Sequence, residues 1–179
     1  MLLSKTAYYA DFAINAIIIG ALTLIAACGA DWARRLQWFA LLVTGMVAWT
    51  LLEYLLHRFV LHQLPIFSHM HAAHHDSPRA LVGAPTWLSL TFLWLAIFLP
   101  AWRSLSFNVA SGLIAGVMLG YLWYGILHHA IHQRRPRLLA SRLQTSIHRH
   151  LRHHYSSAAG NFGVTTPLWD YLFGTSCRE

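Results

Sequence analysis

Residues 36–62 have the sequence LQWFALLVTGMVAWTLLEYLLHRFVLH. No charged side chain occurs before Glu53, and His57 follows that acid four positions later. An apolar run of about 20 residues is long enough to cross the roughly 30 Å hydrocarbon core of a bilayer as a helix. This stretch therefore predicts a transmembrane helix that ends on a histidine-bearing segment.

The rest of the chain repeats this apolar character. Of its 179 residues, 56% are hydrophobic and only 11% are charged, whereas a soluble domain has about 25% charged residues. The two cysteines, Cys28 and Cys177, are too few for a disulfide framework or a thiolate metal site. Composition thus predicts an integral membrane protein without cysteine-based metal binding.

Four apolar stretches are long enough to be considered as membrane spans, and they are residues 8–28, 36–56, 86–102 and 105–127. An isolated strand cannot satisfy its backbone in lipid, and the alternation of a β-barrel is absent, so each stretch is predicted to be a helix. The predicted fold is all-α: a single membrane domain over residues 1–179, built as a four-helix transmembrane bundle. We expect a turn at Gly29–Arg35 and a break at Pro100–Ser104.

Four crossings place both termini and the segments after the second and fourth helices on one side of the membrane. These two segments, 57–82 and 128–175, hold all the histidines and are predicted to form a helical cap. Ten basic residues fall on this side, namely Lys5, Arg58, Arg79, Arg134, Arg135, Arg137, Arg142, Arg149, Arg152 and Arg178. Arg34, Arg35 and Arg103 fall on the other. The positive-inside rule therefore predicts a cytoplasmic cap and cytoplasmic termini.

The formal net charge of +7 raises the question of nucleic-acid binding. The basic residues lie beside hydrophobic segments and form no RNA-binding signature. Anionic lipid headgroups are the expected partner of this charge, and no nucleic-acid partner is predicted.

The 13 histidines are clustered in the sequence. Ten of them form four spaced groups, which are His57 and His62; His71, His74 and His75; His128 and His132; and His150, His153 and His154. On an α-helix, residues i, i+3 and i+4 share a face, so each H-x2-H-H motif presents three imidazoles together. The five-residue spacing of His57 and His62 separates them by about 140° on a regular helix, so they either serve different metals or mark the end of the helix.

Ten imidazoles can supply five ligands to each of two metal ions and leave one open position on each. A structural zinc site needs four ligands and is closed, so ten histidines are too many for that role. Imidazole binds iron, zinc, copper and nickel alike, and the ligand type alone does not name the metal. His69, His129 and His148 fall outside the shared spacing and are not predicted as ligands.

With these motifs, the chain resembles the fatty acid hydroxylase and sterol desaturase superfamily. The resemblance runs from Glu53 to Thr175 and includes, besides the histidine groups, Asn161-Phe-Gly163 and Trp169-Asp-Tyr-Leu-Phe-Gly174-Thr175. The motif order is similar to that of fatty acid 2-hydroxylases, which add a hydroxyl next to the acyl carbonyl. The resemblance implies a non-haem di-iron oxidoreductase that uses O2 and two electrons to hydroxylate a membrane lipid.

The same resemblance implies the cofactors and partners. Two iron ions would occupy the histidines, and zinc can replace them in a purified sample because the ligands are all imidazoles. Eukaryotic 2-hydroxylases often carry a fused cytochrome b5 domain, which this sequence has no room for. Electrons are therefore expected from a separate donor, such as a cytochrome b5-like protein or a ferredoxin.

Three acids lie close in sequence to the histidine motifs: Glu53, Asp76 and Asp170. A metal-bound imidazole normally donates its other N–H to a carboxylate, a carbonyl or water. We expect at least one of these acids to accept such a bond. For Asp76 a helix or turn cap is the alternative, and for Asp170 an ion pair with an arginine.

Other functions remain open at this point. Acyl desaturases also use histidine boxes, and a sterol or carotenoid substrate would suit a related hydroxylase. A metal transporter or storage protein is a third class, but transport requires polar residues along the spans. The spans beginning at residues 36, 86 and 105 are nearly free of them before Glu53 and His128.

Overall fold

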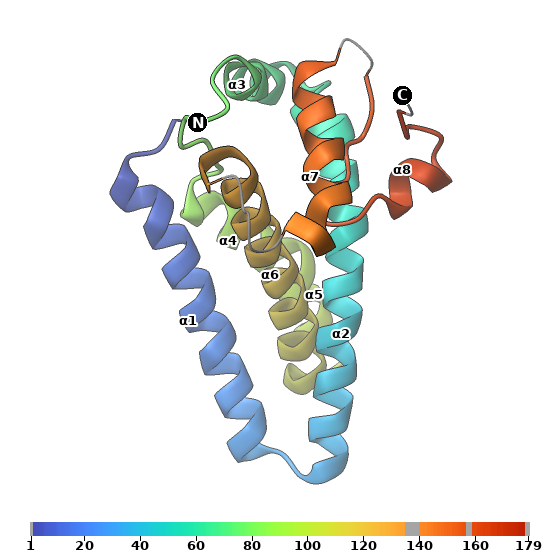
Figure 1. Cartoon of the computed structure of the whole chain (residues 1–179). Coiled ribbons are helices and arrows are strands. Elements are labelled where there is room, and N and C mark those ends of the chain that lie inside the picture. The colour runs from blue at the N-terminus through green and yellow to red at the C-terminus, as the bar shows by residue number, and fades with distance from the viewer. Residues whose placement is uncertain (1, 135–139, 157–158, 178–179) are drawn as a thin grey trace. The chain divides into compact units, whose positions relative to one another are not determined.

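The computed structural model describes residues 2–134, 140–156 and 159–177. The chain folds into helices and short π-helical segments (Figure 1). In chain order they are α1 (Lys5–Gly29), α2 (Trp32–Leu55), η1 (Leu56–Leu61), α3 (Pro65–Asp76), α4 (Thr86–Leu93), η2 (Trp94–Phe98), α5 (Leu99–Ser104), α6 (Phe107–His129), η3 (Ala130–Arg134), α7 (Ala140–Tyr155) and α8 (Leu168–Leu172). Within the described ranges no strand occurs, and a single antiparallel bridge joins Leu2 to Val82.

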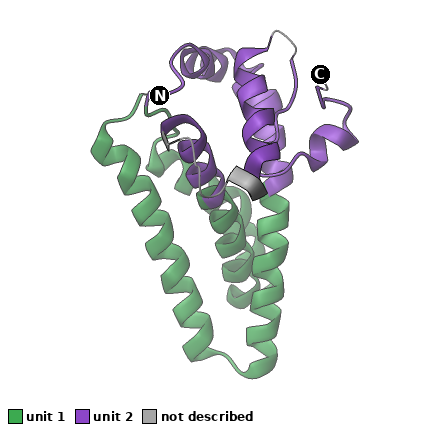
Figure 2. Ribbon diagram, in the orientation of Figure 1, with its two compact units in different colours: residues 1–49, 81–122 green, residues 50–80, 123–179 purple. Residues whose placement is uncertain are grey.

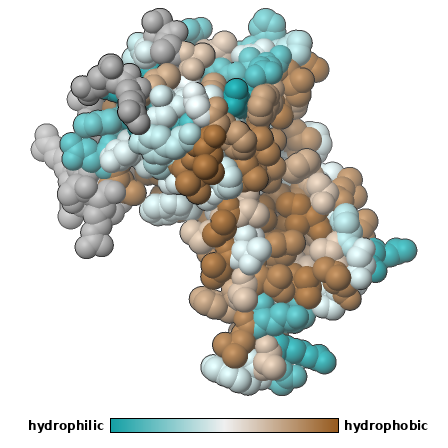
Figure 3. All heavy atoms as spheres, turned by 90° about the vertical axis from the view of Figure 1, so that its right-hand side faces the viewer, coloured by the Kyte–Doolittle hydropathy of each residue, from teal (hydrophilic) through white to brown (hydrophobic). Residues whose placement is uncertain are grey.

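Four helical runs are long and apolar enough to cross a membrane. They are Lys5–Gly29, Trp32–Leu61, Thr86–Ser104 and Phe107–Gln133. Large hydrophobic side chains are widely exposed along them, and hydrophobic residues cover much of the face shown in the space-filling view (Figure 3). Such a surface is stable in lipid rather than in water. The predicted all-α membrane fold is confirmed.

The contacts divide the chain into two compact units (Figure 2). Unit 1 consists of residues 1–49 and 81–122, and unit 2 of residues 50–80 and 123–179. The chain passes between them within α2 and again within α6, so each of these helices contributes to both units.

Unit 1 owes its close helix packing to glycines on α2 and α6. A Cβ atom at Gly116 would collide with the backbone of Leu42, and one at Gly45 would collide with the backbone of Leu113. Small residues let transmembrane helices approach closely and gain van der Waals contact, which is their main source of association energy in lipid.

A polar contact also joins α1 to α6 inside unit 1. Tyr121 donates its hydroxyl to Asp11 at 2.8 Å, and Asn15 donates its amide to the Asp11 carbonyl at 2.8 Å. Asp11 and Asn15 are both buried. A carboxyl group among apolar helices requires such partners, because an unsatisfied one is costly to bury.

Unit 2 is built around Leu127, Ile131 and Val164. The helix α7 packs its apolar side chains against this cluster, while its other positions are mainly histidine and arginine. The loop that follows α7 and the short helix α8 complete the unit, with Trp169 donating to the hydroxyl of Thr50 at 2.9 Å.

Two details differ from the sequence predictions or lie beyond them. The expected break between the third and fourth spans is found at its last residue: the helical run Thr86–Ser104 ends at Ser104, and α6 begins at Phe107. The run is not broken at Pro100, which directly follows the π-helical segment η2 and the first residue of α5, because a π-helical segment already interrupts the regular i to i−4 hydrogen bonds. Of the arginines assigned to one membrane side, Arg135, Arg137 and Arg178 lie outside the described residues, and of Arg134 and Arg142 only the backbone is described.

Candidate metal centre

The predicted histidines form two groups in unit 2. Within each group, the possible ligand atoms lie within 4.8 Å of one another. We call the first group site A, and its members are His74, His128, His132, His150 and His154. We call the second group site B, and its members are His57, His62, His71 and His153. Nine of the ten predicted residues thus lie in groups that could hold a metal ion, and His69, His129 and His148 belong to neither.

The tenth residue, His75, lies beside both sites. Its Nε2 atom is 3.1 Å from Nε2 of His71, and its ring stacks on that of His154 with 4.1 Å between centroids. His75 is therefore within reach of site B without belonging to the compact group of four.

A π-helical segment brings His57 and His62 together. The segment η1 spans Leu56–Leu61, and a π-helix closes its hydrogen bonds five residues apart, so residues i and i+5 approach alignment. The two rings lie 5.2 Å apart, and both belong to site B. The sequence left open whether His57 and His62 serve different metals. The grouping instead indicates that both belong to one site.

Each H-x2-H-H motif contributes to both sites. From α3, His74 joins site A and His71 joins site B. From α7, His150 and His154 join site A, and His153 joins site B. The three imidazoles of a motif share one broad helix face, but that face borders two sites rather than one.

The distances between imidazoles fit the coordination sphere of a metal ion. Nε2 atoms face each other at 3.0 Å in His57–His71, 3.1 Å in His62–His153, 3.0 Å in His74–His128 and 2.9 Å in His132–His150. For metal–nitrogen bonds of about 2.1 Å, ligands at right angles are about 3.0 Å apart, whereas tetrahedral ligands are about 3.4 Å apart. The spacing suits six-coordinate geometry, in which five imidazoles leave one position open.

Burial keeps these imidazoles in the neutral form that binds metal. It lowers the pKa of His74 to about 3, with His132 lowering it further. It lowers the pKa of His62 to about 4, and that of His153 to about 3 although a hydrogen bond to the Gly160 carbonyl opposes this shift. These three imidazoles are therefore uncharged at pH 7. Nε2 of His154 is buried and has no hydrogen-bond partner among the described residues, which suits a ligand atom.

The hydrogen bonds of the Nδ1 atoms differ between the two sites. In site B, His57 donates from Nδ1 to the Phe162 carbonyl at 2.6 Å, and His153 donates from Nδ1 to the Gly160 carbonyl at 2.8 Å. In site A, the Nδ1 atoms of His74 and His150 are buried and have no hydrogen-bond partner among the described residues.

The structure places the three candidate acids differently from one another. Glu53 and Asp170 are buried and accept hydrogen bonds from the backbone of residues 162–165. Asp170 also lies 3.4 Å from Arg149, the arginine ion pair named as its alternative. Asp76 is exposed at the end of α3, where its charge raises the pKa of His75 against the lowering effect of burial.

The backbone carbonyls of Gly160 and Phe162 were not predicted as functional groups. The sequence Asn161-Phe-Gly163 predicts a turn, and the structure shows one left-handed residue there, Asn161 at a φ of 57°. A left-handed residue is compatible with asparagine. The contact of this segment with the histidines becomes visible only in the three-dimensional structure, because His57 and His153 are far from it or separated from it in the sequence.

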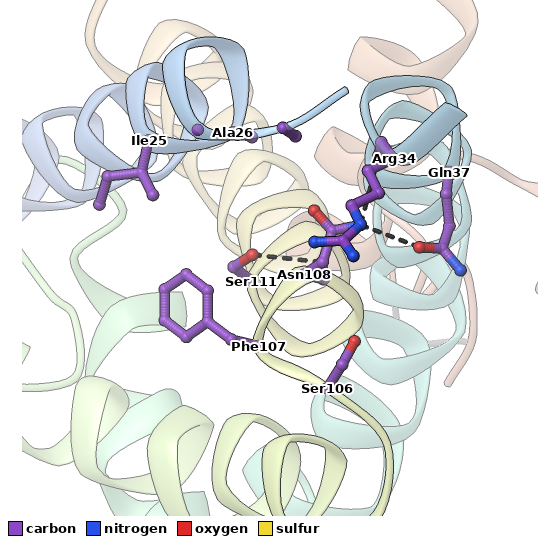
Figure 4. A pocket seen from close by; sticks show the side chains of 10 residues that line it. Ile25, Ala26, Arg34, Gln37, Ser106, Phe107, Asn108 and Ser111 are labelled. Atoms are coloured by element: carbon purple, nitrogen blue, oxygen red, sulfur yellow. Dashed lines mark hydrogen bonds between the residues drawn. The ribbon is translucent and has the colours of Figure 1, made fainter. Parts of the chain in front are cut away.

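The structure contains a cavity beside the histidine groups and another away from them. One of about 360 Å³ is lined by residues that include His62, His71 and His75 and therefore opens beside site B. The other, of about 430 Å³, belongs to unit 1 and is lined by residues that include Arg34, Gln37 and Asn108 (Figure 4). Its described lining residues include no histidine, so it is not part of the metal centre.

Comparison with known proteins agrees with this geometry. The model of the fatty acid hydroxylase family matches residues 42–175, which include every histidine of both sites. The chain belongs to the fatty acid hydroxylase family. The family and the relatives of this chain are named as hydroxylases, and hydroxylases are oxidoreductases.

Relatives in this family are named as 2-hydroxylases. The chain is 37% identical over 151 residues to the fatty acid 2-hydroxylase of Rattus norvegicus, covering 78% of this chain and 40% of that one. It is 32% identical over 145 residues to the dihydroceramide fatty acyl 2-hydroxylase FAH2 of Arabidopsis thaliana, covering 73% and 58%. The chain thus spans 40% and 58% of the length of these two relatives.

A solved structure of the family has a similar fold. The hydroxylase domain visible in full-length scs7p superposes with a TM-score of 0.81 at 26% identity, covering 97% of this chain and 68% of that one. This match and the four apolar helices support a membrane protein.

Proposed function

We propose that this protein hydroxylates the acyl chain of a membrane lipid next to its carbonyl, at a centre of two metal ions bound by sites A and B. The observation that carries the proposal is the pair of imidazole groups with Nε2 atoms 2.9–3.1 Å apart, in a chain of the fatty acid hydroxylase family. The names of the relatives, fatty acid 2-hydroxylase and dihydroceramide fatty acyl 2-hydroxylase, support the substrate class.

The ten predicted histidines would bind the metal ions, with His75 completing site B. Iron at these imidazoles would supply the redox chemistry that O2 activation requires. The chain's own residues hold the ligands neutral by burial and fix two of them through backbone carbonyls. Zinc is expected to replace iron in some preparations, because imidazole binds both.

The reaction requires partners beyond the lipid. One oxygen atom of O2 is inserted into a C–H bond of the lipid. The other oxygen atom is reduced to water by two electrons and two protons. We propose a separate donor for the electrons, either a cytochrome b5-like protein or a ferredoxin. Because ten of the thirteen basic residues belong to the histidine-bearing side of the predicted topology, this side is proposed to be cytoplasmic, where such donors occur.

Lipid mass spectrometry of cells with and without the protein tests the proposal. The expected product is a 2-hydroxy acyl chain whose new oxygen comes from isotopically labelled O2. A His150→Ala variant should abolish it, whereas His148→Ala, an exposed neighbour on α7, should not. A double bond in place of the hydroxyl would indicate a desaturase, and the absence of any O2-dependent lipid product would refute the proposal.

A further inference from the structure

The loop of residues 160–165, which we call the carbonyl loop, connects the imidazoles of site B to two buried carboxylates. Its carbonyls at Phe162 and Gly160 accept hydrogen bonds from Nδ1 of His57 and of His153. Because a carbonyl can only accept, Nδ1 of each ring carries the proton and Nε2 is free to bind metal. The loop therefore sets both the tautomer and the orientation of two site B ligands.

The carbonyl loop is itself held by the carboxylates. Asp170 accepts from the backbone N–H of Phe162 at 2.8 Å and of Gly163 at 2.9 Å. Glu53 accepts from the backbone N–H of Val164 at 2.6 Å and of Thr165 at 3.0 Å. Four consecutive backbone N–H groups are thus bound by two acids.

Neither acid has much freedom to move. Asp170 has no exposed surface and Glu53 is 3% exposed. Asp170 also accepts from the hydroxyl of Thr175 at 2.8 Å, and Glu53 from the hydroxyl of Thr165 at 2.6 Å. A buried carboxylate with several donors is rigid, because moving it would leave a charge unsatisfied in a poorly solvating environment.

We propose that Glu53 and Asp170 are positioning residues for the metal ion of site B. They fix the carbonyl loop, and the loop aims the imidazoles of His57 and His153 at the ion. The proposal rests on the proposed function only in that site B binds a metal ion. In site A, the Nδ1 atoms of His74 and His150 have no hydrogen-bond partner in the part of the chain that the structure describes, so the carbonyl loop acts on site B.

The test compares metal retention in Glu53→Gln and Asp170→Asn with that of the wild type. Each amide keeps the size of the side chain but replaces one acceptor oxygen by a donor, which faces a backbone N–H. Loss of an outer hydrogen-bond partner typically lowers metal affinity 10- to 100-fold, and we expect about tenfold for site B. Asp31→Asn is the matched control, because Asp31 is exposed in the turn between α1 and α2.

The number of ions per chain after a graded chelator challenge distinguishes positioning from general loss of structure. The wild type should keep two ions under conditions in which Asp170→Asn keeps one. Adding His62→Ala to Asp170→Asn should leave that count at one, whereas adding His150→Ala should reduce it to none. Loss of both ions in parallel from Asp170→Asn alone would indicate a merely structural role and overturn the proposal.

A milder variant covers the case in which the acid variants do not fold. Thr165→Val removes only the hydroxyl bond to Glu53 and keeps both charges. It should weaken retention at site B by a smaller factor, and unchanged retention would overturn the proposal. If the wild type binds two ions but oxidises no lipid, the proposed function fails while the positioning role can still be measured.

Discussion

Acidification of the metal-free protein is expected to destabilise it steeply below pH 6.5. His74 and His153 are 3% and 7% exposed, and burial lowers the pKa of each to about 3 from an ordinary value of 6.5. Between these values the unfolded chain binds protons that the folded chain excludes. The stabilisation is therefore fully present above pH 6.5 and is lost as the pH falls toward 3.

The size of the effect follows from the two pKa values. Each pH unit below 6.5 costs about 1.4 kcal/mol for a histidine that stays neutral in the folded state. At pH 4.5 the limit is about 3 kcal/mol for each of His74 and His153, or about 6 kcal/mol together, which is comparable to the stability of a whole domain. For a chain of this length, that corresponds to a fall in Tm of about 10–20 °C.

Thermal unfolding in detergent, followed by tryptophan fluorescence between pH 7.5 and 4.5, measures this dependence. His74→Asn should reduce the slope, because one proton-binding group is removed, while His148→Asn on the exposed side of α7 should not. Bound metal competes with protons and should move the transition to lower pH. A Tm that stays constant over this range in the metal-free wild type would refute the reasoning.

Two further substitutions test the packing of unit 1. Gly116→Leu should destabilise the protein by about 1–3 kcal/mol, because its Cβ meets the backbone of α2, whereas Gly20→Leu should have little effect because nothing lies within 4 Å of its Cβ; both are measured by thermal unfolding. Tyr121→Phe should cost about 1–3 kcal/mol by leaving an oxygen of Asp11 without its donor, and Tyr155→Phe, on a side chain that is 71% exposed, is its control. Equal Tm values within either pair would contradict the corresponding contact.

The helices were predictable because their signal is local. Apolar length alone gives four spans, and the structure begins α2 at Trp32 and α6 at Phe107, a few residues from the predicted starts at 36 and 105. The close approach at Gly116 was not predicted. The local sequence around a glycine in an apolar helix does not indicate which helix it faces, since that depends on how two helices cross.

The histidine groups show where the local argument stops. At about 100° per residue, positions i+3 and i+4 lie on opposite flanks of position i and span an arc of about 100°. Spacing therefore predicts that His71, His74 and His75 share a face, but not that the face borders two sites. The π-helical turn at η1 is likewise not encoded by periodicity, and without it His57 and His62 would diverge.

The division of each motif between two sites has a consequence for assembly. Helix α3 has 12 residues, a length at which an isolated helix is only marginally stable in water, and its buried side chains are His71 and His74. Those two residues belong to different sites, and each site also needs a histidine of α7. Docking of α3 against α7 therefore completes both sites in one step.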